Sequence, residues 1–184
     1  MAEKIPPPIS YESYIQEIQQ MCAEDQAMRT RALENDMIIE SEEDNTLDAR
    51  NTKRMKEIVA EIGWPTISKV GKDISNDAWL LVQHADHDLA FQKQCLEMMK
   101  QQPKVDVDSS NIAYLEDRIR VHEGRPQLYG TQFFSEKMGD PMIPRPIEDP
   151  NNLDARRKAA GLEPFSEYEK HYKDKYKKYD KPKA

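Results

Sequence analysis

The stretch that decides the fold is DAWLLVQHADHDLAFQKQCLEMMKQQ, residues 77–102. Apolar residues recur along it at the three- and four-residue spacings of an amphipathic α-helix. Asn76 or Asp77 can cap its start, and Pro103 closes it. The pattern therefore predicts one helix over 77–102, the longest of the chain.

Similar helical patterns continue on both sides of this stretch. The acidic segment ESEEDNTLD, residues 40–48, interrupts them, and we interpret it as a loop that ends at a cap near Asp48. Gly63 and Gly71 mark two further breaks. The predicted helices are 10–33, 51–62, 77–102, 110–122, 153–162 and a final one that begins at Pro164.

The segment 126–150 has a different composition. It contains five prolines and two β-favouring runs, QLYGTQFF and MIPRPI, which lie on either side of Gly139 and Asp140. These features predict an irregular two-stranded hairpin within 126–147. The fold class we expect is mainly α: a single helical-bundle domain with one short β-hairpin or extended flap.

The domain boundaries follow from the ends of these patterns. We expect one helical domain over 10–170, preceded by an extended lead-in at 1–9 and followed by a basic Lys/Tyr tail at 171–184 that is partly disordered. A chain of 184 residues suits one domain with tails.

Composition narrows the class of protein. No run approaches the roughly 20 apolar residues of a membrane span, and residues 1–20 lack the apolar core of a secretory signal, so we expect a cytoplasmic protein with no membrane partner. The net charge of -7 argues against a nucleic-acid partner. Cys22 and Cys95 are too few for a disulfide framework, and we expect both to be buried and reduced.

Polar residues interrupt the apolar faces of three predicted helices. On a helical wheel of 77–102, the residues His84, Asp88 and Gln92 stack at i, i+4 and i+8 inside the apolar arc, whereas Asp86 lies on the solvated face. In the predicted helix 110–122, Arg118 lies in the middle of the apolar face and Asp117 lies at its border. In the predicted helix 10–33, the interrupting residues are Asp25, Gln26 and Arg29.

Because an isolated buried charge costs several kcal/mol, we expect these polar residues to converge. Two interpretations remain open. One is a salt-bridge lattice that sets helix register, and the other is a ligand or active-site pocket. In a pocket, His84 would be a general base that Asp88 orients, and Arg29 and Arg118 would hold a carboxylate or phosphate.

No cofactor and no metal are expected. The spacing His84-x-x-His87-Asp88 invites comparison with His-Asp metal phosphohydrolases, but that family needs a further histidine upstream, and residues 1–83 contain none.

An ordered set of motifs resembles a bacterial family known only as a domain of unknown function. The matching blocks contain GWP (63–65), QHADHDLAFQ (83–92), YLEDRI (114–119), PQLYGTQ (126–132) and RRKAAGL (156–162). The resemblance implies no activity. It adds Asp86, Asp117, Gln132 and the pair Arg156–Arg157 to the candidate positions.

The PQLYGTQ motif allows two interpretations of its role. As an extended strand it would place Gln127, Tyr129 and Thr131 on one face, where they could close a pocket and contact a ligand, and Gly130 would allow close backbone approach. The alternative is a strand that packs on the helices for shape. Arg156 and Arg157 could clamp an anion or pair with the acidic N-terminal half.

We therefore expect one of two functions. The first is a small cytosolic enzyme of hydrolase or transferase type, with non-redox acid–base chemistry on a small anionic or peptide-like substrate. The candidate catalytic residues are His84, Asp88 and Asp117, and the candidate binding residues are Asp25, Gln26, Arg29, Asp86, Gln92, Arg118, Gln127, Tyr129, Thr131, Gln132, Arg156 and Arg157. The second is a non-catalytic ligand-binding or protein-interaction module. The oligomeric state stays open.

Overall fold

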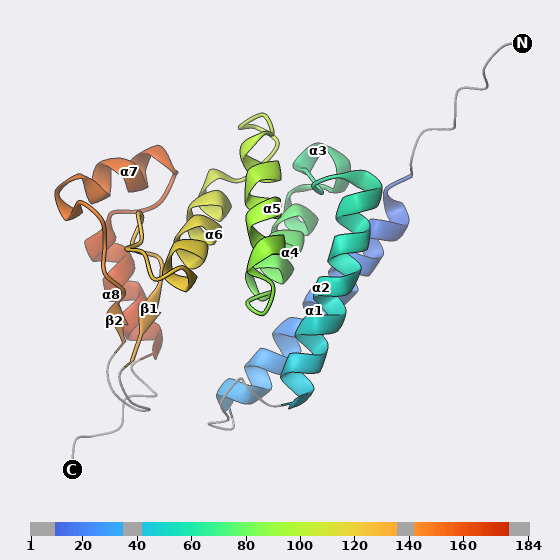
Figure 1. The fold of residues 1–184 in the computed structure, drawn as a ribbon, viewed down its shortest axis with the longest axis horizontal. Coiled ribbons are helices and arrows are strands. Elements are labelled where there is room, and N and C mark those ends of the chain that lie inside the picture. The colour runs from blue at the N-terminus through green and yellow to red at the C-terminus, as the bar shows by residue number, and fades with distance from the viewer. Residues whose placement is uncertain (1–9, 35–41, 136–141, 177–184) are drawn as a thin grey trace, which may run out of the picture. The chain divides into compact units, whose positions relative to one another are not determined.

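A computed structural model describes residues 10–34, 42–135 and 142–176 of the chain (Figure 1). These residues fall into two compact units, which divide between His87 and Asp88. Within the described ranges helices dominate, and the one sheet is an antiparallel pair of two-residue strands. The prediction of a mainly α-helical protein with one short hairpin is confirmed. No helix in these ranges is both long and apolar enough to cross a bilayer.

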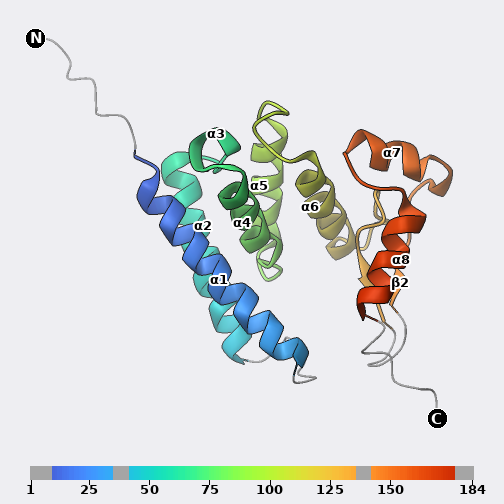
Figure 2. The ribbon, with the colours of Figure 1, turned by 180° about the vertical axis from the view of Figure 1, so that it is seen from behind.

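The first unit is built on two long helices. They are α1 (Glu12–Glu34) and α2 (Glu42–Ile62), which lie side by side and run in opposite directions (Figure 2). A short helix, α3 (Ile67–Val70), follows them, and α4 (Lys72–Gln83) packs against both α1 and α2.

Helical periodicity explains the core of this unit. The buried residues of α1 follow one another at three- or four-residue spacing, as expected for a single helix face. Asp25 lies in the middle of this face and is fully buried. The buried residues of α1 are Ile18, Met21, Cys22, Asp25, Met28 and Ala32, and the apolar ones of α2 are Met55, Ile58, Val59 and Ile62.

The predicted acidic loop at 40–48 is wrong over most of its length. Residues 42–48 form the first two turns of α2, and residues 40 and 41 lie outside the described ranges. Acidic residues at a helix N-terminus are stabilised by the positive end of the helix dipole, so the charge that suggested a loop favours a helix start. Asp48 therefore lies inside α2 instead of capping it.

The predicted single helix over 77–102 is also wrong. The chain forms α4, which begins at Lys72 and ends at Gln83, and a second helix, α5 (Leu89–Lys100). Between them the sequence HADHD is poor in helix-forming residues. Asp88 caps α5, since its carboxylate accepts a hydrogen bond from the Phe91 amide at 3.0 Å.

The second unit combines helices with the hairpin. Here α5 packs on α6 (Ser109–His122), and β1 (Phe133–Phe134) pairs with β2 (Ile143–Pro144), within the predicted range 126–147. The remaining elements are a 3-10 helix (Pro150–Asn152), α7 (Leu153–Ala159) and α8 (Phe165–Tyr176). Because α8 extends to Tyr176, part of the predicted tail is helical, and residues 1–9 and 177–184 lie outside the described ranges.

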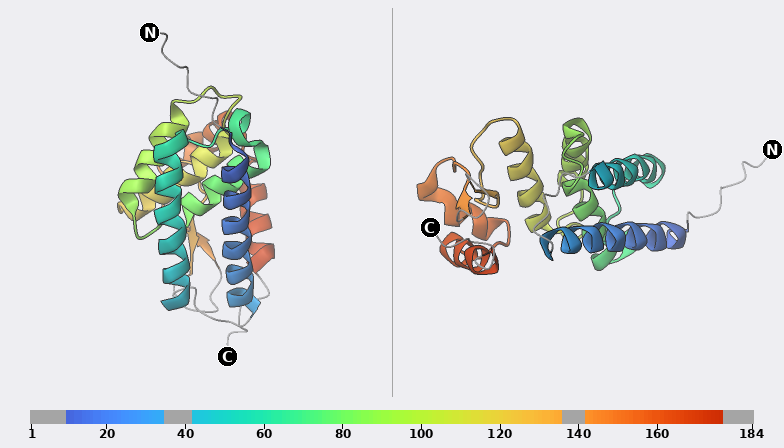
Figure 3. Two further views of the ribbon diagram at one scale, coloured as in Figure 1. Left: turned by 90° about the vertical axis from the view of Figure 1, so that its right-hand side faces the viewer. Right: turned by 90° about the horizontal axis from the view of Figure 1, so that it is seen from below.

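Aromatic packing joins the hairpin to the helices of this unit. Phe133 of β1 stacks on Tyr172 of α8, with 4.1 Å between ring centroids. The backbone course of these elements can be followed in Figure 3. The Tyr168 ring of α8 packs edge-on against Phe133 of β1 and against Tyr114 of α6. Such pairs contribute about 0.5–1.5 kcal/mol each beyond area burial, so they stabilise a hairpin too short to stand alone.

Candidate functional site

A buried carboxylate and an imidazole form the centre of a polar cluster in the first unit. Asp25 of α1 lies 2.9 Å (Oδ2) and 3.0 Å (Oδ1) from Nδ1 of His84, the residue that caps the C-terminus of α4. Gln26 donates a further hydrogen bond from Nε2 to Asp25 Oδ2 at 2.7 Å. The structure thus brings together polar residues that lie about 60 positions apart in the sequence.

The charge of Asp25 determines which nitrogen of His84 carries the proton. A carboxylate can only accept, so the contact requires that Nδ1–H donates to Asp25. Nε of Arg29 lies 3.0 Å from Nδ1 and 3.1 Å from Asp25 Oδ1, and in this tautomer it donates to the carboxylate. Every hydrogen bond of the His84 ring to a described residue involves Nδ1. In the neutral ring, Nε2 is then the nitrogen that carries the lone pair.

Asp48 of α2 completes the cluster, and sequence reasoning missed it. Arg29 Nη2 lies 2.7 Å from Asp48 Oδ1 and 3.1 Å from Asp25 Oδ1, so one guanidinium bridges two carboxylates. The sequence did contain a signal for it. If residues 42–62 are treated as one helix, Asp48 lies one turn before Asn51 and Thr52, which are buried, and therefore on the same face.

The two carboxylates have opposite electrostatic environments. Burial raises the pKa of Asp25, but hydrogen bonds from His84 and Arg29 more than offset this and hold its pKa below the ordinary value. Burial also raises the pKa of Asp48, and Arg29 offsets this effect only in part. Asp25 is therefore the residue suited to stay ionised beside an imidazole.

Three side chains of the cluster are partly exposed to solvent. The side chains of His84, Arg29 and Asp48 are 16%, 18% and 18% exposed, whereas that of Asp25 is 1% exposed. Two carboxylates against one guanidinium leave one negative charge, which a proton on His84 would neutralise. The imidazole is therefore a partly exposed group of the cluster that lies directly against the buried carboxylate.

The helix break changes the expected partners of His84. The prediction that His84, Asp88 and Gln92 share one face of one helix is wrong, because α4 has ended before Asp88 begins α5. The contacts of Asp88 support a capping role. Gln92 is fully buried on α5, and Asp86 lies exposed between the two helices.

Asp117 organises a loop of the second unit. The wheel placed Asp117 at the border of the apolar face of α6 and Arg118 in its middle, but Asp117 is fully buried and Arg118 is only half-buried. The Asp117 carboxylate accepts hydrogen bonds from the amides of Leu128, Tyr129 and Thr131, and from Thr131 Oγ1 at 3.0 Å. Four donors from one loop support a structural role.

The same loop replaces the strand predicted over PQLYGTQ. In the longer run QLYGTQFF (127–134), only Phe133 and Phe134 are strand residues. Gly130 has φ +72° and turns the chain before them. The amide group of Gln127 bridges the loop: Nε2 donates to the carbonyls of Gln132 and Arg145, and Oε1 accepts from the Gln132 amide.

Arg156 and Arg157 of α7 bind carbonyl groups of this unit. Arg156 donates to the carbonyls of Leu128, Glu148 and Asp149. Arg157 is fully buried, donates to the carbonyls of Glu163 and Tyr129, and lies over the Tyr168 ring at 4.7 Å. Arg156 Nη1 also pairs with the Asp149 carboxylate at 3.7 Å. These contacts support a role in holding loop 128–131.

Gly130 leads to a first testable prediction. A Cβ there would lie 2.7 Å from Cε2 of Phe165, whereas a Cβ on Gly124, which also has φ +72°, meets nothing within 4 Å. Both Gly→Ala changes carry the cost of a positive φ, about 1–2 kcal/mol, and only Gly130→Ala adds a collision of about 1–3 kcal/mol. Denaturant unfolding should show the larger loss for Gly130→Ala. Equal losses would contradict the close approach to Phe165.

The two cysteines lead to a second prediction. Both are buried free thiols, as expected. Burial, with Asp77 near Cys22 and Asp88 near Cys95, raises both pKa values to about 12. At pH 8 so little thiolate forms that iodoacetamide should react roughly a thousandfold more slowly than with an unperturbed thiol. The urea-unfolded chain is the control, and prompt alkylation of either native cysteine would refute the prediction.

A family model of unknown function matches residues 13–181. The chain belongs to this family, DUF6624. The resemblance expected from the motifs is thus confirmed at the level of the family. No curated protein and no solved structure matches the chain. Among the described residues of this DUF6624 member, no group of three or more His, Cys, Asp or Glu side chains could hold a metal ion.

Proposed function

We propose that this DUF6624 protein is an enzyme whose acid–base centre is His84, in a cluster with Asp25, Arg29 and Asp48. The reaction is of hydrolase or transferase type, on a small anionic or peptide-like substrate. One observation carries the proposal: the buried Asp25 carboxylate holds Nδ1 of a partly exposed imidazole whose Nε2 has no hydrogen bond to a described residue.

His84 acts in two proton transfers. Nε2 takes a proton from a water molecule or hydroxyl group while the oxygen of that group attacks the substrate. The imidazolium that forms keeps its hydrogen bond to Asp25 through Nδ1–H, which stabilises the new positive charge. It then returns the proton to the leaving group, so His84 ends the cycle neutral.

Arg29 has a double role in this scheme. Its Nε and Nη2 atoms hold Asp25 ionised and tie α1 to Asp48 of α2. Its hydrogen bonds to described residues leave Nη1 unused, so this atom can donate to an oxygen of an anionic substrate. This supports the anionic substrate class over a neutral apolar one.

The test is substrate profiling of the full chain. A small-molecule extract and a mixture of short peptides are incubated with wild-type protein and with His84→Gln, and mass spectrometry follows which compounds disappear. The proposal requires at least one compound that only the wild type consumes. If compounds are retained equally by both proteins and none is consumed, the cluster serves binding or helix register, and the enzymatic proposal fails.

A further inference from the structure

A small cavity lies in the second unit, where α6 ends and the chain turns towards residue 126. It has a volume of about 260 Å³ and is lined by Val121, Gly124, Arg125, Pro126, Arg145 and Pro146. None of these residues belongs to the His84 cluster. Since pockets for drug-sized ligands have volumes of roughly 300–1,000 Å³, a ligand here must be small.

Hydrogen bonds hold the walls of this cavity in place. The Gln127 amide donates to the carbonyl of Pro146 at 2.9 Å, and Gln127 Nε2 donates to the carbonyl of Arg145 at 2.8 Å. On the other side, Arg120 Nε donates to the carbonyl of Pro126 at 2.7 Å. Because these segments are already ordered, a ligand would lose little free energy in organising them.

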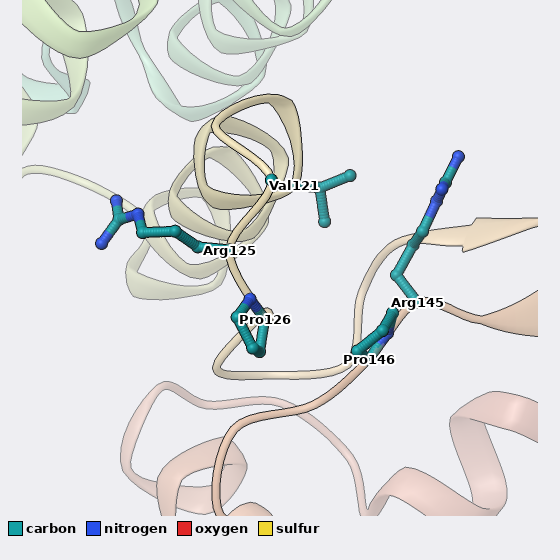
Figure 4. A pocket seen from close by; sticks show the side chains of 6 residues that line it. Val121, Arg125, Pro126, Arg145 and Pro146 are labelled. Atoms are coloured by element: carbon teal, nitrogen blue, oxygen red, sulfur yellow. The ribbon is translucent and has the colours of Figure 1, made fainter.

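The two arginines of the cavity differ in their partners. Arg125 pairs with Glu123. The Arg145 guanidinium stacks over the ring of Phe134, 4.2 Å from the centroid, and within the described ranges no carboxylate pairs with it. Figure 4 shows Arg125 and Arg145 extending in opposite directions from the two segments that border the cavity.

We propose that this cavity binds a small carboxylate with a compact apolar body. Val121, Pro126 and Pro146 offer apolar surface to the body of the ligand, and the planar guanidinium of Arg145 can donate two parallel hydrogen bonds to the carboxylate. Stacking on Phe134 restricts the guanidinium and reduces the side-chain entropy that binding would cost.

The test uses benzoate as the probe and benzamide as its uncharged analogue, with amide chemical shifts of the full-length 15N-labelled protein as the measurement. Benzoate should shift the amides of Val121, Gly124 and Arg145, with a Kd on the order of 1 mM for so small a ligand. Benzamide should bind at least about tenfold more weakly, because it cannot accept two charge-assisted hydrogen bonds.

Two matched variants make the test specific. Arg145→Gln should weaken benzoate binding about tenfold or more, while Arg125→Gln, a change in the same cavity at an already paired arginine, should alter it less than about twofold. Unchanged denaturant midpoints would show that both variants fold. Equal binding of benzoate and benzamide, shifts confined to other residues, or equal effects of the two variants would each overturn the proposal.

Discussion

His84→Gln should lower turnover of the profiled substrate by about 10²–10⁴-fold, the usual contribution of general acid–base catalysis. Glutamine is of similar size and can still donate to Asp25, so the fold should be nearly intact. What it cannot do is take a proton at the position of Nε2. The measurement pairs turnover with the denaturant midpoint on the same preparation.

The matched control is His87→Gln. It makes the same chemical change three residues along the chain, at an exposed side chain. It should leave both turnover and stability close to those of the wild type. If His84 serves only the helix packing of the first unit, His84→Gln should instead cost about 1–3 kcal/mol of stability with turnover per folded molecule unchanged, and this result would falsify the catalytic role.

Asp117→Ala should destabilise the second unit by about 3–5 kcal/mol. The change removes the acceptor for the amides of Leu128, Tyr129 and Thr131 and leaves a cavity at a fully buried position. Urea unfolding measures the total loss. Hydrogen exchange at these three amides measures the local effect, and exchange there should accelerate more than at the amides within α6.

Asp108→Ala is the control for this prediction. Asp108 caps the same helix, and its carboxylate accepts from the Ser110 amide at 2.9 Å at a partly exposed site. Loss of such a cap costs about 1 kcal/mol. If the two variants lose equal stability, or if the Leu128 amide stays protected in Asp117→Ala, the loop is not held by Asp117.

Local patterns were sufficient for α1, α6, α7 and α8. The ends of α6 follow from the cap at Asp108 and the glycine at 124, and the face of α1 follows from its three- and four-residue spacing. The same spacing showed that Asp25 is a carboxylate in an apolar stripe. Its convergence with Arg29 and His84 could be inferred because a buried charge requires partners.

The break between α4 and α5 was the main error with consequences for the site. Apolar periodicity continues through HADHD, so a wheel alone cannot detect the break. The low helix propensity of this segment and the capping carboxylate of Asp88 were the signals that should have outweighed it. Without them, Asp88 was assigned to orient His84, a role that the contacts of Asp25 support better.

The partners of individual polar groups were decided only by tertiary structure. The sequence alone determined a mainly helical chain with one short hairpin, because repeat spacing, caps and breakers are local properties. It could not determine that Arg29 bridges Asp25 and Asp48, or that loop 128–131 encloses Asp117. The contacts of Arg29 with Asp48 and of Asp117 with the loop join different segments, and which donor satisfies a buried carboxylate depends on how those segments pack.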